Sequence, residues 1–155
     1  DPLQQAASMH RQHERFLDIH EDDDFVREYM EAIGHHEFGK GLKPVNFNGW
    51  LDDDSDRTPE SLSYWVRYWG AAYRFVLDHA GDNTVLVSYA RLTDEPHASL
   101  ARLAGRLDIP EADLASQADR IQAPRRHAAD SGDISESLRH RTDQLYEQLE
   151  DQALN

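Results

Sequence analysis

A single β-branched run most constrains the fold, because every other periodic segment of the chain is helical. Residues 84–89 read Thr-Val-Leu-Val-Ser-Tyr and lie between Asp82-Asn83 and a polar turn. A nearly continuous apolar run of this length is typical of an interior parallel strand. One strand cannot be stable alone, since its backbone donors and acceptors would lack partners. We therefore expect this strand to pair with strands from a part of the molecule outside this chain, or from another chain.

Helical periodicity describes most of the remaining sequence. Apolar residues that recur every three or four positions predict helices over residues 2–19, 24–33, 58–80, 96–107, 111–114 and 134–153. The helix over residues 58–80 carries the longest apolar stripe, so we expect it to be buried. Residues 34–57 show no sustained period and predict a long irregular loop, and residues 122–133 predict a flexible basic segment.

Composition describes a chain of one domain's length. Its 155 residues, 39% apolar and 30% charged, are typical of a soluble globular protein. No apolar run approaches the roughly 18 residues that a membrane-spanning helix needs. The lack of cysteine excludes disulfides and is compatible with the cytoplasm, which is where we expect the protein. A net charge of −14, from 30 acidic and 16 basic residues, argues against a nucleic-acid partner, because phosphate backbones favour Lys and Arg.

Three short motifs follow one another within the first 110 residues. Asp1-Pro2 and Ser8 fit the pattern Arg-x-Pro-x-x-x-x-x-Ser, whose Arg would stand immediately before Asp1. Residues 64–69, Tyr-Trp-Val-Arg-Tyr-Trp, form an aromatic helix. Residues 85–92, Val-Leu-Val-Ser-Tyr-Ala-Arg-Leu, precede Pro96 and a Leu-rich helix. In this order the motifs resemble the sulfotransferase family, in which a comparable strand ends in Tyr-Glu-Asp-Leu.

The resemblance implies a fold and an activity. Residues 1–155 would be the mostly helical C-terminal portion of an α/β, P-loop-type sulfotransferase fold. The N-terminal half with the phosphosulfate-binding loop would lie outside the chain, which alone should be inactive. Such an enzyme transfers a sulfuryl group from 3′-phosphoadenosine 5′-phosphosulfate (PAPS) to a hydroxyl or amine of a small-molecule or carbohydrate acceptor. No metal is expected.

The resemblance also assigns roles to individual residues. Ser8 would donate a hydrogen bond to the 3′-phosphate of PAPS, and Tyr89 would lie near the adenine. Arg125 and Arg126 are candidates for a second phosphate contact, because the family's usual Arg-Lys-Gly triplet is absent near the C-terminus. The acceptor pocket would have the aromatic helix and the 34–57 loop as walls.

The sequence departs from the family pattern in several places. Ala90 and Arg91 replace the Glu and Asp of the usual strand end, and Asp108 stands where Gly is common. The chain also lacks a Gly-rich or Lys-containing phosphate loop after a strand. The family's usual base lies upstream of the segment that matches Ser8.

His35 and His36 are candidate catalytic residues on the acceptor side. They stand at the head of the 34–57 loop, and histidine titrates near neutral pH, so either could act as a base. The same pair, together with His10, His13 and Glu37, is compatible with a zinc-dependent hydrolase. Metal sites, however, need three or four convergent ligands, which sequence spacing does not bring together here.

An interaction protein is a further alternative. In this interpretation the chain is an acidic helical module whose strand pairs with a partner and whose Trp-rich helix supplies an interface. A homo-oligomer is compatible with this interpretation and with the enzymatic ones.

Overall fold

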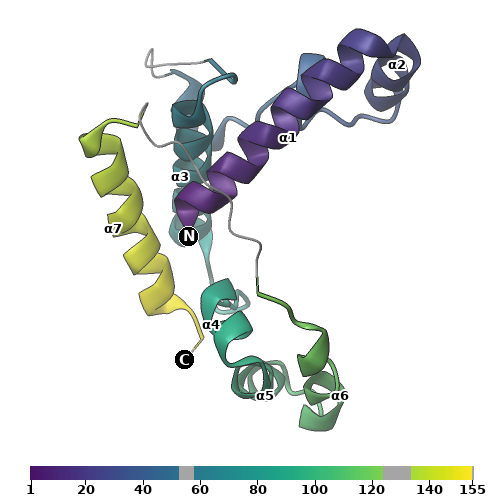
Figure 1. The fold of residues 1–155 in the computed structure, drawn as a ribbon. Helices are drawn as coiled ribbons and strands as arrows, with labels where there is room; N and C mark the ends of the chain where they lie inside the picture. Colours follow the sequence, from purple (N-terminus) through teal and green to yellow (C-terminus); the bar gives the residue numbers. More distant parts are fainter. Residues whose placement is uncertain (53–57, 124–133, 155) are drawn as a thin grey trace.

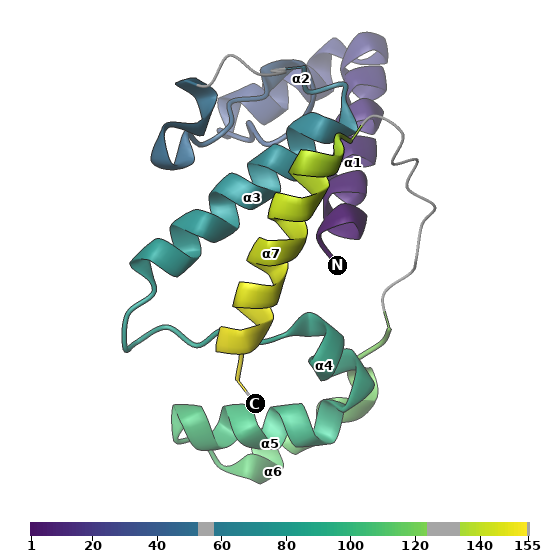
Figure 2. The same ribbon diagram turned by 90° about the vertical axis from the view of Figure 1, so that its left-hand side faces the viewer.

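The structure, a computed structural model, describes residues 1–52, 58–123 and 134–154, and all regular structure within these ranges is helical. The helices are α1 (Pro2–Asp22), α2 (Asp24–Ala32), η1 (Gly39–Gly41), η2 (Phe47–Asp52), α3 (Leu62–His79), α4 (Tyr89–Asp94), α5 (Pro96–Leu107), α6 (Glu111–Ala115), η3 (Ala118–Arg120) and α7 (Glu136–Gln152). The long helices α1, α3 and α7 form the main body, and α2 lies at the far end of α1 (Figure 1). Helices α4, α5 and α6 form a separate group below them in both ribbon views (Figures 1 and 2).

The predicted α/β fold, with a parallel strand at residues 84–89, is wrong for the described residues. Residues 84–88 belong to no helix and no strand, and Tyr89 is the first residue of α4. A β-branched run forms a strand only where a neighbouring strand takes up its backbone hydrogen bonds. Within the described ranges no second strand does so, and the backbone of Leu86 instead accepts one hydrogen bond from the amide of Leu154, at 2.8 Å.

Capping side chains set where α1, α2, α3 and α7 begin. The Asp1 side chain accepts a hydrogen bond from the Gln4 amide at 3.2 Å, so α1 begins at Pro2 as predicted. Asp23 caps α2, and Ser135 caps α7. Helix α3 begins at Leu62, four residues later than predicted, because Ser61 is its cap. Local polar residues therefore define the helix starts more sharply than the apolar pattern does.

The core lies where α1, α3 and α7 meet. Trp65 and Val66 of α3 are 1% exposed, which confirms the expected burial for the first half of this helix, whereas residues 70–79 are half-buried or exposed. Ala6 and Ala7 face them from α1, and Leu138 joins from α7. Small alanine side chains allow α1 to approach the aromatic face of α3 closely, so the core combines large rings on one helix with small residues on the other.

The loop that follows α2 is irregular, as predicted, over the residues that the structure describes. It contains the short helices η1 and η2, and η2 is kinked at Asn48 and Gly49, where φ is +50° and +77°. Only Gln122 and Ala123 of the predicted basic segment are described. None of the described helices combines the length and the apolar character that crossing a membrane requires.

Candidate functional site

Two segments that are far apart in the sequence meet at one cavity. Its volume is about 150 Å³, and it is lined by Asp1, Pro2 and Gln5 from the start of α1 and by the run 86–90 before and at the start of α4. Helices α3 and α7 supply the remaining walls. We call this space the aromatic cavity, because Trp69, Tyr73, Tyr89 and Tyr146 all contribute to its lining.

A hydrogen-bonded amide organises the ring systems on one side of the aromatic cavity. The Trp69 indole N–H donates to the Gln5 side-chain oxygen at 3.0 Å, and the Gln5 amide nitrogen donates to the Tyr73 hydroxyl at 3.3 Å. The Trp69 and Tyr73 ring centroids are 4.6 Å apart. Tyr89 is 57% exposed, and its hydroxyl donates to the Gln122 carbonyl at 3.5 Å. An exposed ring such as that of Tyr89 can stack on a flat heterocycle.

Glu150, which lines the aromatic cavity together with a second acidic residue, Asp1, forms hydrogen bonds with neighbouring groups. The Ser88 hydroxyl donates to its carboxylate at 2.9 Å, and the Arg91 guanidinium donates to its backbone carbonyl at 3.0 Å. Burial, followed by the nearby negative charge of Glu150, raises the pKa of Tyr146, so its phenol stays protonated at neutral pH. Arg91 Nη1 is buried and has no hydrogen-bond partner among the described residues.

The structure brings together only part of the predicted nucleotide site. Tyr89 and Asp1-Pro2 share the aromatic cavity, but Ser8 lies two turns further along α1, is exposed, and does not line the cavity. Arg125 and Arg126 lie outside the described residues. Sequence reasoning missed Trp69 as a lining residue, although its place in the aromatic motif was a signal, and it missed Tyr146, for which the sequence offered none.

His35 and His36 lie in the loop after α2, at the opposite end of α1 from Asp1 (Figure 1). His35 Nδ1 is 2.7 Å from the Glu37 carboxylate. His36 Nδ1 is 3.2 Å from the Gly41 carbonyl. The structure therefore separates both candidate bases from Tyr89.

Two buried histidines of α1 hold the loop backbone. His13 and His20 are each 2% exposed, and seven-residue spacing places them on one face of the helix. The Gly39 amide donates to His13 Nδ1 at 3.1 Å, and the Lys40 amide donates to His20 Nδ1 at 3.3 Å. Gly39 has φ +73°, and a Cβ there would lie 2.7 Å from the His20 ring. We call this arrangement the histidine clamp; in it each ring accepts one backbone hydrogen bond through Nδ1.

Two of the histidines that the zinc hypothesis requires as ligands form hydrogen bonds with the protein backbone instead. His13 Nδ1 accepts a hydrogen bond from the Gly39 amide, and His10 Nε2 is 2.7 Å from the Glu60 carbonyl. In residues 1–52, 58–123 and 134–154, no three His, Cys, Asp or Glu side chains lie close enough together to hold a metal ion.

A second cavity lies between the loop and the aromatic helix. Its volume is about 430 Å³, and its lining includes His13, Leu42, Leu51, Glu60 and Tyr64. Burial raises the pKa of Tyr64 to about 12, so the phenol is neutral and can donate a hydrogen bond. We call this space the loop cavity; it combines a mostly apolar wall with a few polar groups.

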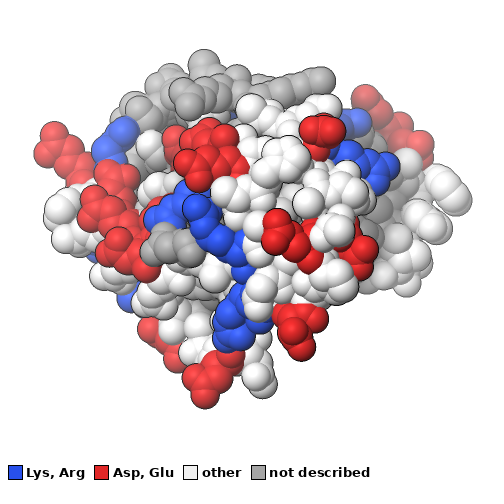
Figure 3. Space-filling view, turned by 90° about the horizontal axis from the view of Figure 1, so that it is seen from below, with Lys and Arg blue, Asp and Glu red and all other residues white. Residues whose placement is uncertain are grey.

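Charges of both signs share the surface. On the face that Figure 3 shows, acidic and basic side chains lie interspersed among neutral ones. Acidic groups that interrupt the basic ones disfavour a polyanion partner on this face.

No known protein family, curated protein or solved structure matches the chain. The functional conclusion therefore depends on the chain's own residues and their geometry.

Proposed function

We propose that this chain supplies nucleotide and acceptor contacts of a PAPS-dependent sulfotransferase. One observation carries the proposal: Asp1-Pro2 and the run 86–90, from the two motifs whose resemblance concerns the nucleotide, line the same aromatic cavity. Helices and the run 86–90 form the walls of the aromatic cavity. The proposal therefore does not use a parallel sheet within the described residues.

The aromatic cavity would hold the adenine ring. Its volume of about 150 Å³ is below the range of complete small-molecule sites, roughly 300–1,000 Å³, so it suits one ring system and leaves the rest of a nucleotide outside. Tyr89 would stack on the base. Ser8 stands about 10 Å further along α1, at a helical rise of about 1.5 Å per residue, and would receive the 3′-phosphate. Arg125 and Arg126 complete this phosphate site in the proposal.

The loop cavity would hold the acceptor. Leu42 and Leu51 favour an apolar body, and the neutral Tyr64 phenol can donate to a polar oxygen of a small molecule. Sulfuryl transfer also needs a base and positive charge near the leaving group. His35 and His36 do not line the loop cavity, where the acceptor would bind, so the proposal gives them no role in the transfer step. A cytoplasmic location belongs to the same proposal.

Nucleotide binding tests the proposal. We expect adenosine 3′,5′-bisphosphate to bind, and Tyr89→Ala to weaken binding about tenfold, because stacking on one ring contributes about 1–3 kcal/mol. Tyr29→Ala is the matched control, since Tyr29 is similarly exposed (55%) but lies on α2. Isothermal titration calorimetry measures both affinities.

A second comparison tests the 3′-phosphate contact. Ser8→Ala should weaken adenosine 3′,5′-bisphosphate about tenfold and leave adenosine 5′-monophosphate unchanged, because only the first ligand carries a 3′-phosphate. Undetectable binding of the bisphosphate, or equal affinity for both nucleotides in the wild-type protein, would rule the proposal out.

An acidic helical interaction module is a second candidate function, but through the exposed face of α2, because the predicted strand is absent from the described residues and Trp65 and Trp69 of the Trp-rich helix are buried. Phe25, Tyr29 and Ile33 recur at four-residue spacing and are 73%, 55% and 52% exposed. An apolar helix face of this kind is typical of a protein interface. Sedimentation equilibrium discriminates this candidate: self-association that Phe25→Asp abolishes supports it, and a monomer at all concentrations opposes a homo-oligomer through α2.

A further inference from the structure

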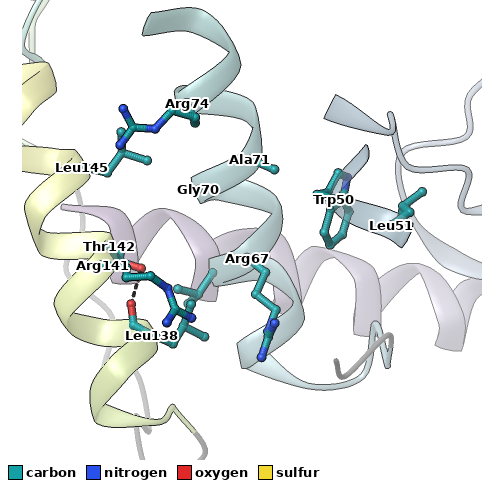
Figure 4. Close-up of a pocket in the computed structure, with 11 residues that line it drawn as sticks. Trp50, Leu51, Arg67, Gly70, Ala71, Arg74, Leu138, Arg141, Thr142 and Leu145 are labelled. Carbon is teal, nitrogen blue, oxygen red and sulfur yellow. Dashed lines mark hydrogen bonds between the residues drawn. The ribbon is translucent and has the colours of Figure 1, made fainter. Parts of the chain in front are cut away.

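A third concave site lies between helices α3 and α7, and we call it the α3–α7 groove. Its volume is about 310 Å³, and it shares no lining residue with the aromatic cavity. Val66, Gly70 and Ala71 line it from α3, and Leu138 and Leu145 line it from α7 (Figure 4). Gly70 has no atom within 4 Å of the position a Cβ would take, so the absence of a side chain there leaves the groove open.

Arginines are the charged residues of this groove. Arg67 and Arg74 come from α3 and Arg141 comes from α7, and no Asp or Glu is among the described lining residues. This is unusual in a chain with 30 acidic and only 16 basic residues. The side chains of Arg74 and Arg141 form no ion pair or hydrogen bond with another described residue. Figure 4 shows Arg74 reaching from α3 toward α7, and Arg141 reaching from α7 toward α3.

We propose that the α3–α7 groove binds a small amphipathic anion, an apolar ring or short chain that carries one oxyanion group such as a sulfate or sulfonate. Arg74 and Arg141 stand at different levels of the groove (Figure 4), and either guanidinium group offers a planar, permanently charged donor that matches the geometry of one oxyanion. The apolar floor accepts the body of the ligand, and the volume lies at the lower end of the range for small-molecule sites. The inference does not depend on sulfotransferase activity.

Charge recognition is tested with naphthalene-2-sulfonate as the probe and 2-naphthalenemethanol as its neutral counterpart. The double variant Arg74→Gln/Arg141→Gln should weaken sulfonate binding at least tenfold and leave the weak binding of the alcohol unchanged. The double variant Arg15→Gln/Arg139→Gln makes the same change in net charge outside the groove, so it should bind the sulfonate like the wild-type protein. Equal weakening in both double variants would mean a general charge effect and would overturn the proposal.

Occupancy of the groove is tested separately with Gly70→Leu. Leucine is a good helix former, so this variant should fold while its side chain fills the groove, and naphthalene-2-sulfonate binding should be lost. Gly105→Leu is the matched control, because Gly105 lies in helix α5 and also has open space at the Cβ position. Sulfonate binding that persists in Gly70→Leu, or inorganic sulfate that binds as tightly as the naphthyl probe, would contradict an amphipathic site.

Discussion

Two histidines of α1 accept hydrogen bonds from loop amides, and each of these bonds requires a lone pair on Nδ1. A protonated imidazole has no lone pair, so the Gly39 amide could no longer bond to His13 Nδ1. Burial lowers the pKa of His13, and the negative charge of Glu60 opposes that effect only in part. His10 and Glu14 also act on the ring, the first lowering the pKa and the second raising it.

Stability should therefore depend on pH through His13. Its folded-state pKa lies below the ordinary value of about 6.5, so the unfolded chain binds the proton more readily. The free energy of unfolding should fall as the pH drops through about 6.5, and it should keep falling until the pH reaches the folded-state pKa. Urea unfolding at pH 7.5 and pH 5.5 measures this difference.

The variant His13→Asn separates this effect from general acid sensitivity. Asparagine keeps a side-chain acceptor near the position of Nδ1 but has no titrating group. The stability difference between the two pH values should shrink in the variant. An unchanged difference would show that other groups cause the pH dependence.

At the scale of single elements, the segment before α4 shows how tertiary contacts override a local preference. Ser88 ends the β-branched run, accepts a hydrogen bond from the Arg91 amide at 3.3 Å, and donates one to Glu150 at 2.9 Å. It is 5% exposed. The serine therefore starts a helix and attaches it to α7, at a place where strand propensity predicts continued extension.

Removal of the Ser88 hydroxyl should lower the free energy of unfolding more than removal of an ordinary helix cap does. Ser88→Ala removes the cap of α4 and the hydrogen bond to Glu150, so we expect a loss of about 2–3 kcal/mol in the free energy of unfolding. Ser135→Ala is the control, because Ser135 caps α7 from an exposed position and should cost only about 1 kcal/mol. Equal losses in the two variants, measured by urea unfolding, would argue against a contribution from the Glu150 contact.

At the scale of the whole molecule, polar contacts connect the α4–α6 group to the long helices. The Glu150 carboxylate of α7 accepts a hydrogen bond from the Ser88 hydroxyl, and the Glu150 backbone carbonyl accepts one from Arg91. The Leu154 amide donates to the Leu86 carbonyl at 2.8 Å. The large aromatic core lies elsewhere, among α1, α3 and α7. A unit held mainly by such contacts opens more easily than a unit that shares a hydrophobic core.

Hydrogen exchange should reveal these two levels of stability. Amides of α4 and α5 should exchange faster than those of α3, and Glu150→Gln should accelerate the exchange of α4 while α3 stays unchanged. Glu147→Gln, an exposed change one turn earlier on α7, is the control. Equal acceleration of α3 and α4 in Glu150→Gln would indicate one cooperative unit. Mass spectrometry of peptic fragments gives the required resolution.

The candidate site was only partly accessible from sequence. Asp1-Pro2 and Tyr89 could be selected by their motifs, and the structure places them around one cavity. Gln5 and Glu150 could not, because an amide or a carboxylate on a polar helix face carries no signal until its partner is known. The same holds for Arg74 and Arg141, which line one groove only because α3 packs against α7.

The sequence by itself determined the helical segments other than α4 and the short helices η1, η2 and η3, together with most of their starts and the buried aromatic face, because caps and periodicity act through hydrogen bonds and contacts within a few residues. Only the tertiary structure decided the state of residues 84–88 and the partners of His13. A strand needs a neighbour that lies far along the chain, and a buried ring needs the loop that folds over it. Such contacts depend on how distant segments pack, which no local pattern specifies.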